Sequence, residues 1–318
     1  MSGILPAPSA RVFKAAALVL GTLLSNPALA EARTLDTRFG ELSIDGEAAR
    51  VVTLYEGALD TSFAVGIAPL GAVATRGGDG VASYMQDKAD GVAIVSTARE
   101  INLESVIALQ PDLILASSSL PEEQYRLLSA VAPTVVADVD MFQDGAWKEE
   151  ARLFARALNR EAELDKVLAE LDQRTAGLAQ RFEQSVPADG RKASLARWMP
   201  QGAMMMSSRL FTSSLLKAVG FDMQDGGIVK EGLPHSSPLS QENLSLVDGN
   251  WLFLATLNHD GREALAAAEQ SPAFARLKVV QQQRVFPVDG QIWTSATGPL
   301  AAHAILDDVE RALEQAAR

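Results

Sequence analysis

From position 44 onward, short apolar runs alternate with stretches in which apolar residues recur every three or four positions. Short runs are typical of buried strands, and the longer period is typical of amphipathic helices. Regular alternation of the two indicates an α/β fold. In the first half we expect strands at 50–54, 69–74, 91–96, 112–116 and 134–137, with helices at 56–65, 102–110 and 121–130.

A long helical pattern follows in the middle of the chain. Residues 145–182 contain no proline and carry two stripes of apolar side chains, which predict two helices that meet near Asn159. The second helix would be about 33 Å long at 1.5 Å per residue, enough to run along a small domain and join two lobes. We therefore expect an N-terminal lobe at 31–160, a connecting helix at 161–185 and a C-terminal lobe at 186–318.

The second half repeats the organisation of the first. Gly66 and Gly220 each follow a predicted helix. Glu104 and Glu242 each lie in the first turn of a predicted helix, and a buried strand begins eight residues after each of them. Two matches in the same order indicate an internal duplication and hence paired lobes. The other expected elements are strands at 193–198, 251–255 and 284–288 and helices at 210–219, 240–247 and 298–317.

The first thirty residues have the features of a cleaved secretory signal. Arg11 and Lys14 precede the apolar run 15–24, and Ala28 and Ala30 form an A-x-A pattern. The run is about half of the roughly 20 residues that a membrane span needs, so we favour cleavage over a retained anchor. Cleavage near Ala30 would release the mature chain into the periplasm.

Composition and charge exclude several classes of function. The chain has 28 Lys and Arg against 40 Asp and Glu, a formal charge of −12, which becomes −14 once the two cations of the signal are removed. So acidic a chain lacks the basic surface of a nucleic-acid-binding protein. There is no cysteine, which excludes disulfides, thiolate metal sites, a cysteine nucleophile and a lipid attached to cysteine.

Signatures of catalysis are absent from the sequence. It contains no phosphate-binding loop, no H-E-x-x-H zinc motif and no G-x-S-x-G nucleophile motif. The histidines His235, His259 and His303 have no spacing suited to a metal. We therefore expect no enzyme, no resident cofactor and no metal site.

The segment 101–115, with the pattern N-L-E-x-x-x-A-L-x-P-D-L-I, resembles the periplasmic substrate-binding proteins of ABC importers for iron–siderophores and cobalamin. The likeness continues through 239–244, Trp293, 298–300 and 305–308, in the order and spacing of the family. It covers nearly all of the mature chain. It implies two Rossmann-like α/β lobes joined by one long helix, with the ligand held between the lobes and only a small closing motion.

The resemblance also implies a partner in the membrane. In this family an exposed glutamate on each lobe docks onto arginines of the ABC transporter permease, and Glu104 and Glu242 stand at those positions. Each glutamate also suits the first turn of a helix, where a negative charge is favoured. The paired placement favours docking. We expect a monomer that binds no nucleic acid.

Candidate ligand-binding residues follow from the strand ends, because ligands of open α/β sheets bind beyond the carboxyl ends of the strands. Tyr55, Arg76, Arg99 and Trp198 each follow or end an expected strand. Arginines suit an anionic ferric chelate, and tryptophans suit its apolar flanks. Arg197 and Trp198 alternate along one strand, so we expect only one of them to face the ligand.

Three further ligand-binding residues rest on the resemblance. Trp293 matches a family position that contacts siderophore and is the leading candidate. Arg209 and His235 lie in loops near family ligand positions. Arg99 departs from the pattern, because hydroxamate-binding relatives carry arginine one residue earlier, where Ala98 stands; a solvated loop position is its alternative.

We therefore expect a protein that captures a ferric siderophore or ferric citrate, with the iron held by the chelator, and delivers it to an inner-membrane ABC transporter. Haem and cobalamin are alternative ligands in the same family, and Tyr55, Tyr84 or His235 could bind haem iron. A periplasmic iron-release enzyme or chaperone is the alternative from another class.

Overall fold

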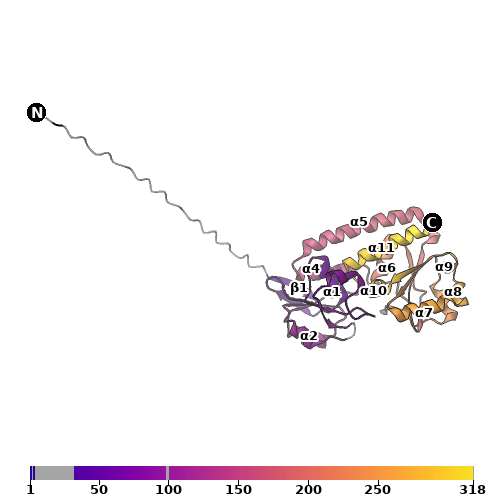
Figure 1. Cartoon of the computed structure of the whole chain (residues 1–318), viewed down its shortest axis with the longest axis horizontal. Coiled ribbons are helices and arrows are strands. Elements are labelled where there is room, and N and C mark those ends of the chain that lie inside the picture. The colour runs from indigo at the N-terminus through magenta and orange to yellow at the C-terminus, as the bar shows by residue number, and fades with distance from the viewer. Residues whose placement is uncertain (2, 4–31, 98–99, 318) are drawn as a thin grey trace.

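Two largely parallel sheets, one in each half of the chain, form the framework of a computed structural model of the protein (Figure 1). The structure describes residues 1, 3, 32–97 and 100–317. The expected signal segment, apart from residues 1 and 3, and Arg99 lie outside this part of the chain. Within it, no helix combines the length and the apolar character that a membrane crossing requires.

The first sheet belongs to the N-terminal lobe and has the order β5-β4-β3-β6-β7, with every neighbouring pair parallel. Its strands are β3 (Val51–Thr53), β4 (Gly71–Val73), β5 (Ala93–Ser96), β6 (Leu113–Ala116) and β7 (Thr134–Val136). The connections contain α1 (Glu56–Ala64), the 3-10 helix η1 (Ser83–Lys88), α2 (Leu103–Ala108) and α3 (Glu122–Ser129). An antiparallel hairpin of β1 (Arg33–Thr37) and β2 (Gly40–Ile44), which the sequence pattern does not predict, precedes the sheet.

One long helix, α5 (Glu161–Ser185), extends from one lobe to the other along the upper side of Figure 1. Its buried residues share one face, which rests on the core: Leu164, Leu168, Leu171, Leu178 and Phe182. The helix α4 (Ala146–Ala157) precedes it, and the closing helix α11 (Pro299–Ala316) lies beside it. Ion pairs of Arg174 with Asp307 and of Arg181 with Glu310 link α5 to α11.

The second sheet belongs to the C-terminal lobe and has the order β10-β8-β11-β12, with β9 added antiparallel to β8. Its strands are β8 (Lys192–Met199), β9 (Gly202–Met205), β10 (Asp222–Gln224), β11 (Trp251–Thr256) and β12 (Val285–Asp289). The helices of this lobe are η2 (Ala188–Gly190), α6 (Phe211–Val219), η3 (Gln241–Val247), α7 (His259–Glu269), α8 (Pro272–Ala275), α9 (Lys278–Gln281) and α10 (Gly290–Thr294). Aromatic rings of Phe221, Trp251, Phe253 and Phe286 pack together in its core.

The fold class predicted from the sequence, two α/β lobes joined by a long helix, is confirmed. The two glycines of the suspected duplication adopt the same type of conformation, because Gly66 and Gly220 follow α1 and α6 with φ of +79° and +117°. This left-handed region favours glycine at the end of a helix. The division of the chain into lobes at 31–160 and 186–318 stays a prediction.

Candidate functional site

The carboxyl ends of the two sheets meet where the lobes face each other. The Ser83 hydroxyl, in η1 of the N-terminal lobe, donates to the carboxylate of Asp289 at the end of β12 over 2.8 Å. A second contact joins the Arg209 Nε, after β9, to the backbone oxygen of Phe142 over 3.2 Å. Ligands of open α/β sheets bind at this edge, so the interface between the strand ends is the candidate site.

Arg197 is a buried cation at this interface. It lies near the end of β8 with 3% of its surface exposed. Its Nη1 donates to the Thr294 hydroxyl over 3.4 Å, its Nη2 lies 4.0 Å from the Met204 sulfur, and its Nε has no hydrogen-bond partner. In the part of the chain that the structure describes, no carboxylate forms an ion pair with it. Because a buried charge without a counterion is costly, the position suits an anion that arrives with a ligand.

Arg76 brings a second positive charge from the other lobe. It is exposed, in the turn that follows β4. Burial, and then repulsion by the Arg76 charge, lower the pKa of Arg197 to about 10. A carboxylate between two guanidinium groups would relieve this repulsion and accept hydrogen bonds from both. We call Arg76, Arg197, Met204 and Thr294 the arginine site.

Glu56 fixes the turn that carries Arg76. Its side chain is buried, and its Oε1 accepts the backbone N–H of Arg76 over 3.3 Å. Burial raises the pKa of Glu56, whereas the nearby Thr75 hydroxyl, the hydrogen bond from the Arg76 backbone N–H and the charge of Arg76 oppose the rise. The carboxyl group thus holds the Arg76 backbone from inside the N-terminal lobe.

Asp60 connects the N-terminal lobe to the start of α11. It lies fully buried on α1 and accepts the backbone N–H groups of Leu300 and Ala301 over 2.8 Å each, and the Tyr84 hydroxyl over 2.9 Å. Burial raises the pKa of Asp60 to about 7, although the three hydrogen bonds favour the ionised form. This contact fixes the position of one lobe relative to the last helix.

Tyr55, which the sequence places at the ligand, directs its hydroxyl group into the protein. Its ring lies over Gly57, where an added Cβ would come within 2.6 Å of the tyrosine Cε1. The hydroxyl oxygen is buried beside Glu150, and burial raises the pKa of Tyr55 well above its usual value. Burial also raises the pKa of Glu150 to about 8. The Tyr55 hydroxyl group therefore faces the buried side chain of Glu150 and not the arginine site.

Both tryptophans that the sequence places at the ligand are buried in the C-terminal lobe. Trp293 has 0% of its surface exposed; its ring stacks on Phe253 with centroids 4.7 Å apart, and its Nε1 donates to Asp308 over 2.6 Å. Trp198 is 7% exposed and packs edge-on against Phe274. Large apolar rings gain most from burial, so neither indole offers a surface to a ligand in this conformation.

Along β8 the structure places Trp198 and Arg197 on opposite faces of the sheet, as their expected alternation implies. Trp198 turns to the core, and Arg197 turns to the interface between the lobes. A signal for this was present in the sequence, because Arg197 is the one charged residue in the run at 193–199. A charged residue in a buried strand indicates a site more strongly than a tryptophan does.

Arg209 and His235 have other partners. Besides the Phe142 contact, Arg209 lies 3.8 Å from Asp140 and 3.6 Å from Glu231, so it bridges the lobes. His235 is half-buried, and its Nδ1 lies 2.8 Å from the backbone oxygen of Ser236. Among the residues that the structure describes, no three His, Asp or Glu side chains come together as a metal site would require.

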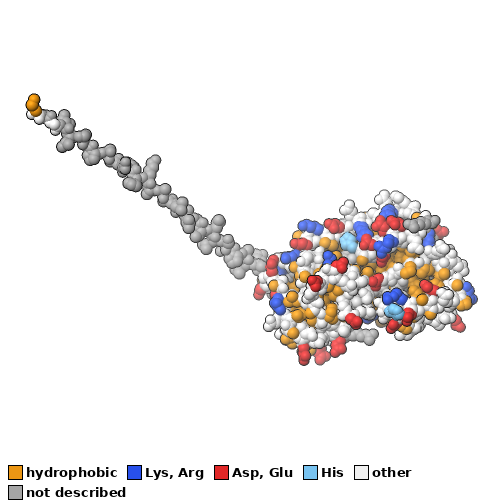
Figure 2. Space-filling view, in the orientation of Figure 1, with side chains coloured by type: hydrophobic (Ala, Val, Ile, Leu, Met, Phe, Trp, Pro, Cys, Tyr) orange, Lys and Arg blue, Asp and Glu red, His pale blue; other side chains and the backbone are white. Residues whose placement is uncertain are grey.

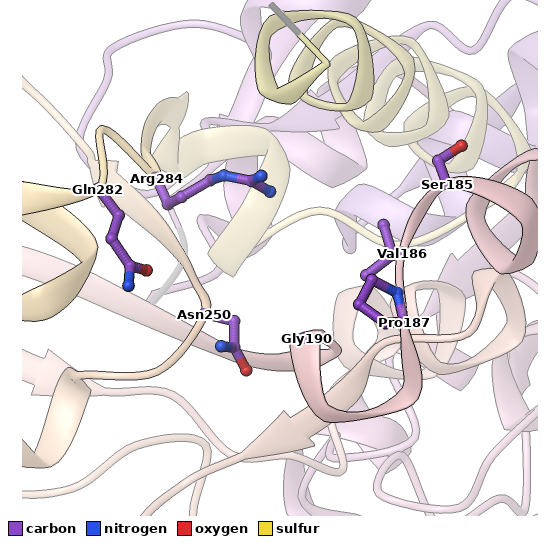
Figure 3. A pocket seen from close by; sticks show the side chains of 7 residues that line it. All are labelled: Ser185, Val186, Pro187, Gly190, Asn250, Gln282 and Arg284. Carbon is purple, nitrogen blue, oxygen red and sulfur yellow. The ribbon is translucent and has the colours of Figure 1, made fainter.

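A cavity of about 380 Å³ opens at the opposite edge of the C-terminal sheet (Figure 3). Arg284 and Asn250 directly precede β12 and β11, so the cavity lies at the amino ends of the strands, away from the arginine site. The Arg284 guanidinium reaches over this cavity in Figure 3. It also lies 4.5 Å from the Trp251 ring and donates to the backbone oxygen of Ala316 over 3.3 Å. These contacts give Arg284 a structural role.

Glu104 and Glu242 are exposed in the first turns of α2 and η3. The helix α2 is capped by Asn102, whose Oδ1 accepts the Ser105 N–H over 3.0 Å. Neither glutamate forms an ion pair with another residue in the described ranges. Both carboxylates are therefore free to bind a partner.

Comparison with known proteins assigns the family. Residues 51–292 match the model of the periplasmic binding protein family. The chain belongs to this family. Its members and the relatives below are binding proteins.

Two relatives and one solved structure show how far the likeness extends. A probable siderophore-binding lipoprotein of Bacillus subtilis, YfiY, is 29% identical over 277 residues, which cover 84% of this chain and 83% of the relative. The achromobactin-binding periplasmic protein of Dickeya dadantii is 27% identical over 273 residues, covering 82% and 85%. The crystal structure of Staphylococcus aureus SirA complexed with staphyloferrin B superposes with a TM-score of 0.75 at 25% identity, covering 89% of this chain and 98% of SirA.

Proposed function

We propose that this chain binds an iron(III) chelate of the ferric siderophore or ferric citrate class between its lobes and delivers it to the permease of an ABC importer. The proposal depends on the burial of Arg197, a cation that has no counterion among the described residues. The charge of Arg76, from the other lobe, also repels it. An anionic chelate supplies the missing negative charge. The chain binds and releases the chelate without changing it chemically.

The chemistry of the arginine site supports a chelate with ionised carboxylates. Guanidinium groups form bidentate, charge-assisted hydrogen bonds with carboxylates. The relatives whose names include siderophore or achromobactin support iron chelates as the class. The iron then belongs to the ligand, and the protein contacts the outer oxygen atoms of the chelator.

Haem fits this site less well, because both tyrosine hydroxyls that could bind its iron are directed into the protein. The Tyr84 hydroxyl donates to Asp60 over 2.9 Å, and the Tyr55 hydroxyl is buried beside Glu150. His235 lies with its Nδ1 against the Ser236 backbone oxygen, so only its Nε2 could reach haem iron. An anionic chelate needs none of these three groups.

The connections between the lobes suit a small closing motion. The stiff helix α5 spans both lobes, and Asp60 holds the start of α11. Opening the interface would break the contacts of Ser83 with Asp289 and of Arg209 with the opposite lobe. We infer that these contacts form when the lobes close on the ligand.

Delivery requires a surface for the permease. We propose that Glu104 and Glu242, one on each lobe, pair with arginines of the permease. We also propose that the protein acts as a monomer in the periplasm after cleavage of its signal segment near Ala30. The acidic surface of the chain, with a charge of −12, is suited to a basic partner.

Calorimetric titration of residues 31–318 with iron(III) citrate and with an uncharged iron(III) trihydroxamate tests the ligand class. We expect the anionic chelate to bind, and Arg76→Gln to weaken it about ten- to hundredfold through loss of charge-assisted hydrogen bonds. Arg126→Gln, which removes an exposed charge of α3, serves as the matched control and should bind like the wild type. Binding of the uncharged chelate alone, or equal affinity in Arg76→Gln, would contradict an anionic chelate held by the arginine site.

A further inference from the structure

The two helices that carry the docking glutamates also expose large apolar side chains. Ile107, in α2, is 49% exposed, and Leu246, in η3, is 37% exposed. Within the described ranges only a few other large apolar residues of the folded lobes are so exposed: Ile94, Leu127, Met141 and Leu233. Two of these few side chains therefore lie in two short helices, on different lobes.

This exposure does not reflect a lack of core for the helices to cover. In α2, Val106 is buried. In η3, Leu244 and Val247 are buried and lie three residues apart, as the inward positions of a 3-10 helix do. The apolar side of each helix thus already packs on the core, and Ile107 and Leu246 lie outside that side.

Each exposed apolar side chain shares its short helix with a free carboxylate. Ile107 is three residues after Glu104, a spacing that makes neighbours on a helix surface. Leu246 is four residues after Glu242 in η3, and both are exposed; in a 3-10 helix this spacing places them about 120° apart, on the two outward sides that flank the buried side of Leu244 and Val247. Figure 2 shows acidic side chains at the lower edge of the molecule, where Figure 1 places α2. A partner that covers these sites needs cations for the carboxylates and an apolar recess beside them.

We propose that Ile107 and Leu246 are the apolar anchors of permease docking, each inserted into a recess whose rim carries the cations that bind Glu104 and Glu242. The inference rests on the proposed function and adds the residues that supply the docking affinity. Charged rims guide association and set its specificity, whereas a few side chains that become fully desolvated in pockets supply most of the binding energy. Ion pairs between the two glutamates and the permease would be exposed and screened by salt, so on their own they would contribute little binding energy.

Leu127 in α3 provides a matched control. It is 53% exposed and follows Glu123 by four residues, so it presents the same kind of apolar and acidic pair outside the two docking helices. Substituting serine there changes surface polarity to the same extent. A general effect of surface apolar residues on solubility or folding would appear in this variant as well.

The test measures binding of the ligand-free protein to the cognate permease–ATPase complex in lipid nanodiscs, and separately calorimetric binding of iron(III) citrate. We expect Ile107→Ser and Leu246→Ser each to weaken docking about tenfold or more, Leu127→Ser to change it less than about twofold, and chelate affinity to stay unchanged in all three. Docking equal to that of Leu127→Ser would overturn this inference alone, and so would a wild-type dimer that Ile107→Ser and Leu246→Ser convert to monomers. Absence of chelate binding by the wild type, with docking altered or not, would overturn the proposed function.

Discussion

Asp60 and Leu300 are 240 residues apart in the chain, and a hydrogen bond of 2.8 Å joins the Asp60 carboxylate to the Leu300 backbone N–H. Ala301 donates to the same carboxylate. Both N–H groups lie in the first turn of α11, where a helix has unpaired donors and favours a negative charge. Asp60 thus ties the first helix of the N-terminal lobe to the last helix of the chain.

Removing this carboxylate should destabilise the protein. We expect Asp60→Ala to lower the free energy of unfolding by about 2–3 kcal/mol, because two buried donors lose their acceptor. Urea denaturation followed by far-UV circular dichroism measures the change. Asp165→Ala removes an exposed carboxylate from α5 and should stay within about 0.5 kcal/mol of the wild type; equal losses in the two variants would show that the α11 contact is unimportant.

Gly298 depends on the same carboxylate. It has φ of +121°, and an added Cβ would lie 2.5 Å from the Asp60 Oδ1. We expect Gly298→Ala to lower the free energy of unfolding by about 2 kcal/mol or more, through backbone strain and displacement of Asp60. Gly177→Ala, inside α5 with no atom within 4 Å of the added Cβ, should instead stabilise by about 0.5–1 kcal/mol. Melting temperatures that rise in both variants would contradict this geometry.

Glu150 should make the stability depend on pH. Burial raises its pKa in the folded state to about 8, whereas a carboxyl group in the unfolded chain titrates near 4.3. Between these values the folded state holds a proton that the unfolded state has released, so the free energy of unfolding falls as pH rises, by up to about 1.4 kcal/mol per pH unit for one group.

The matched variant for this prediction is Glu150→Gln, which keeps the shape of the side chain and removes the titration. Urea denaturation of both proteins at pH 5.5, 7 and 8.5 should show a smaller loss of stability with rising pH in the variant. Parallel pH profiles would mean that Glu150 is ionised in the folded protein at neutral pH.

Much of the fold could be predicted from the sequence, because its elements are long and periodic. The connecting helix was expected to begin at residue 161 and forms from there to Ser185, since its apolar stripe continues to Phe182. The hairpin of β1 and β2 was missed because its strands are short and largely exposed. The strand β9 is not among the predicted elements, because it has only four residues and begins with Gly202 directly after a turn.

The candidate site was harder to predict, since position along a strand does not determine which way a side chain faces. Arg76 lies where the strand ends suggest, at the interface of the lobes. Trp198 lies in the core and Arg197 faces the other way, because a one-residue step along β8 turns the side chain to the other face of the sheet. Burial of Trp293 follows from long-range packing on Phe253, which no local pattern reveals.

The variant Arg197→Met shows whether the charge of Arg197 serves the ligand or the fold. If Arg197 is a buried cation that awaits an anionic ligand, methionine should raise the free energy of unfolding of the ligand-free protein by about 1–3 kcal/mol, because an uncompensated buried charge is removed. The same variant should bind iron(III) citrate about a hundredfold more weakly, or not at all, by calorimetry. A less stable variant that binds iron(III) citrate as tightly as the wild type would contradict the account.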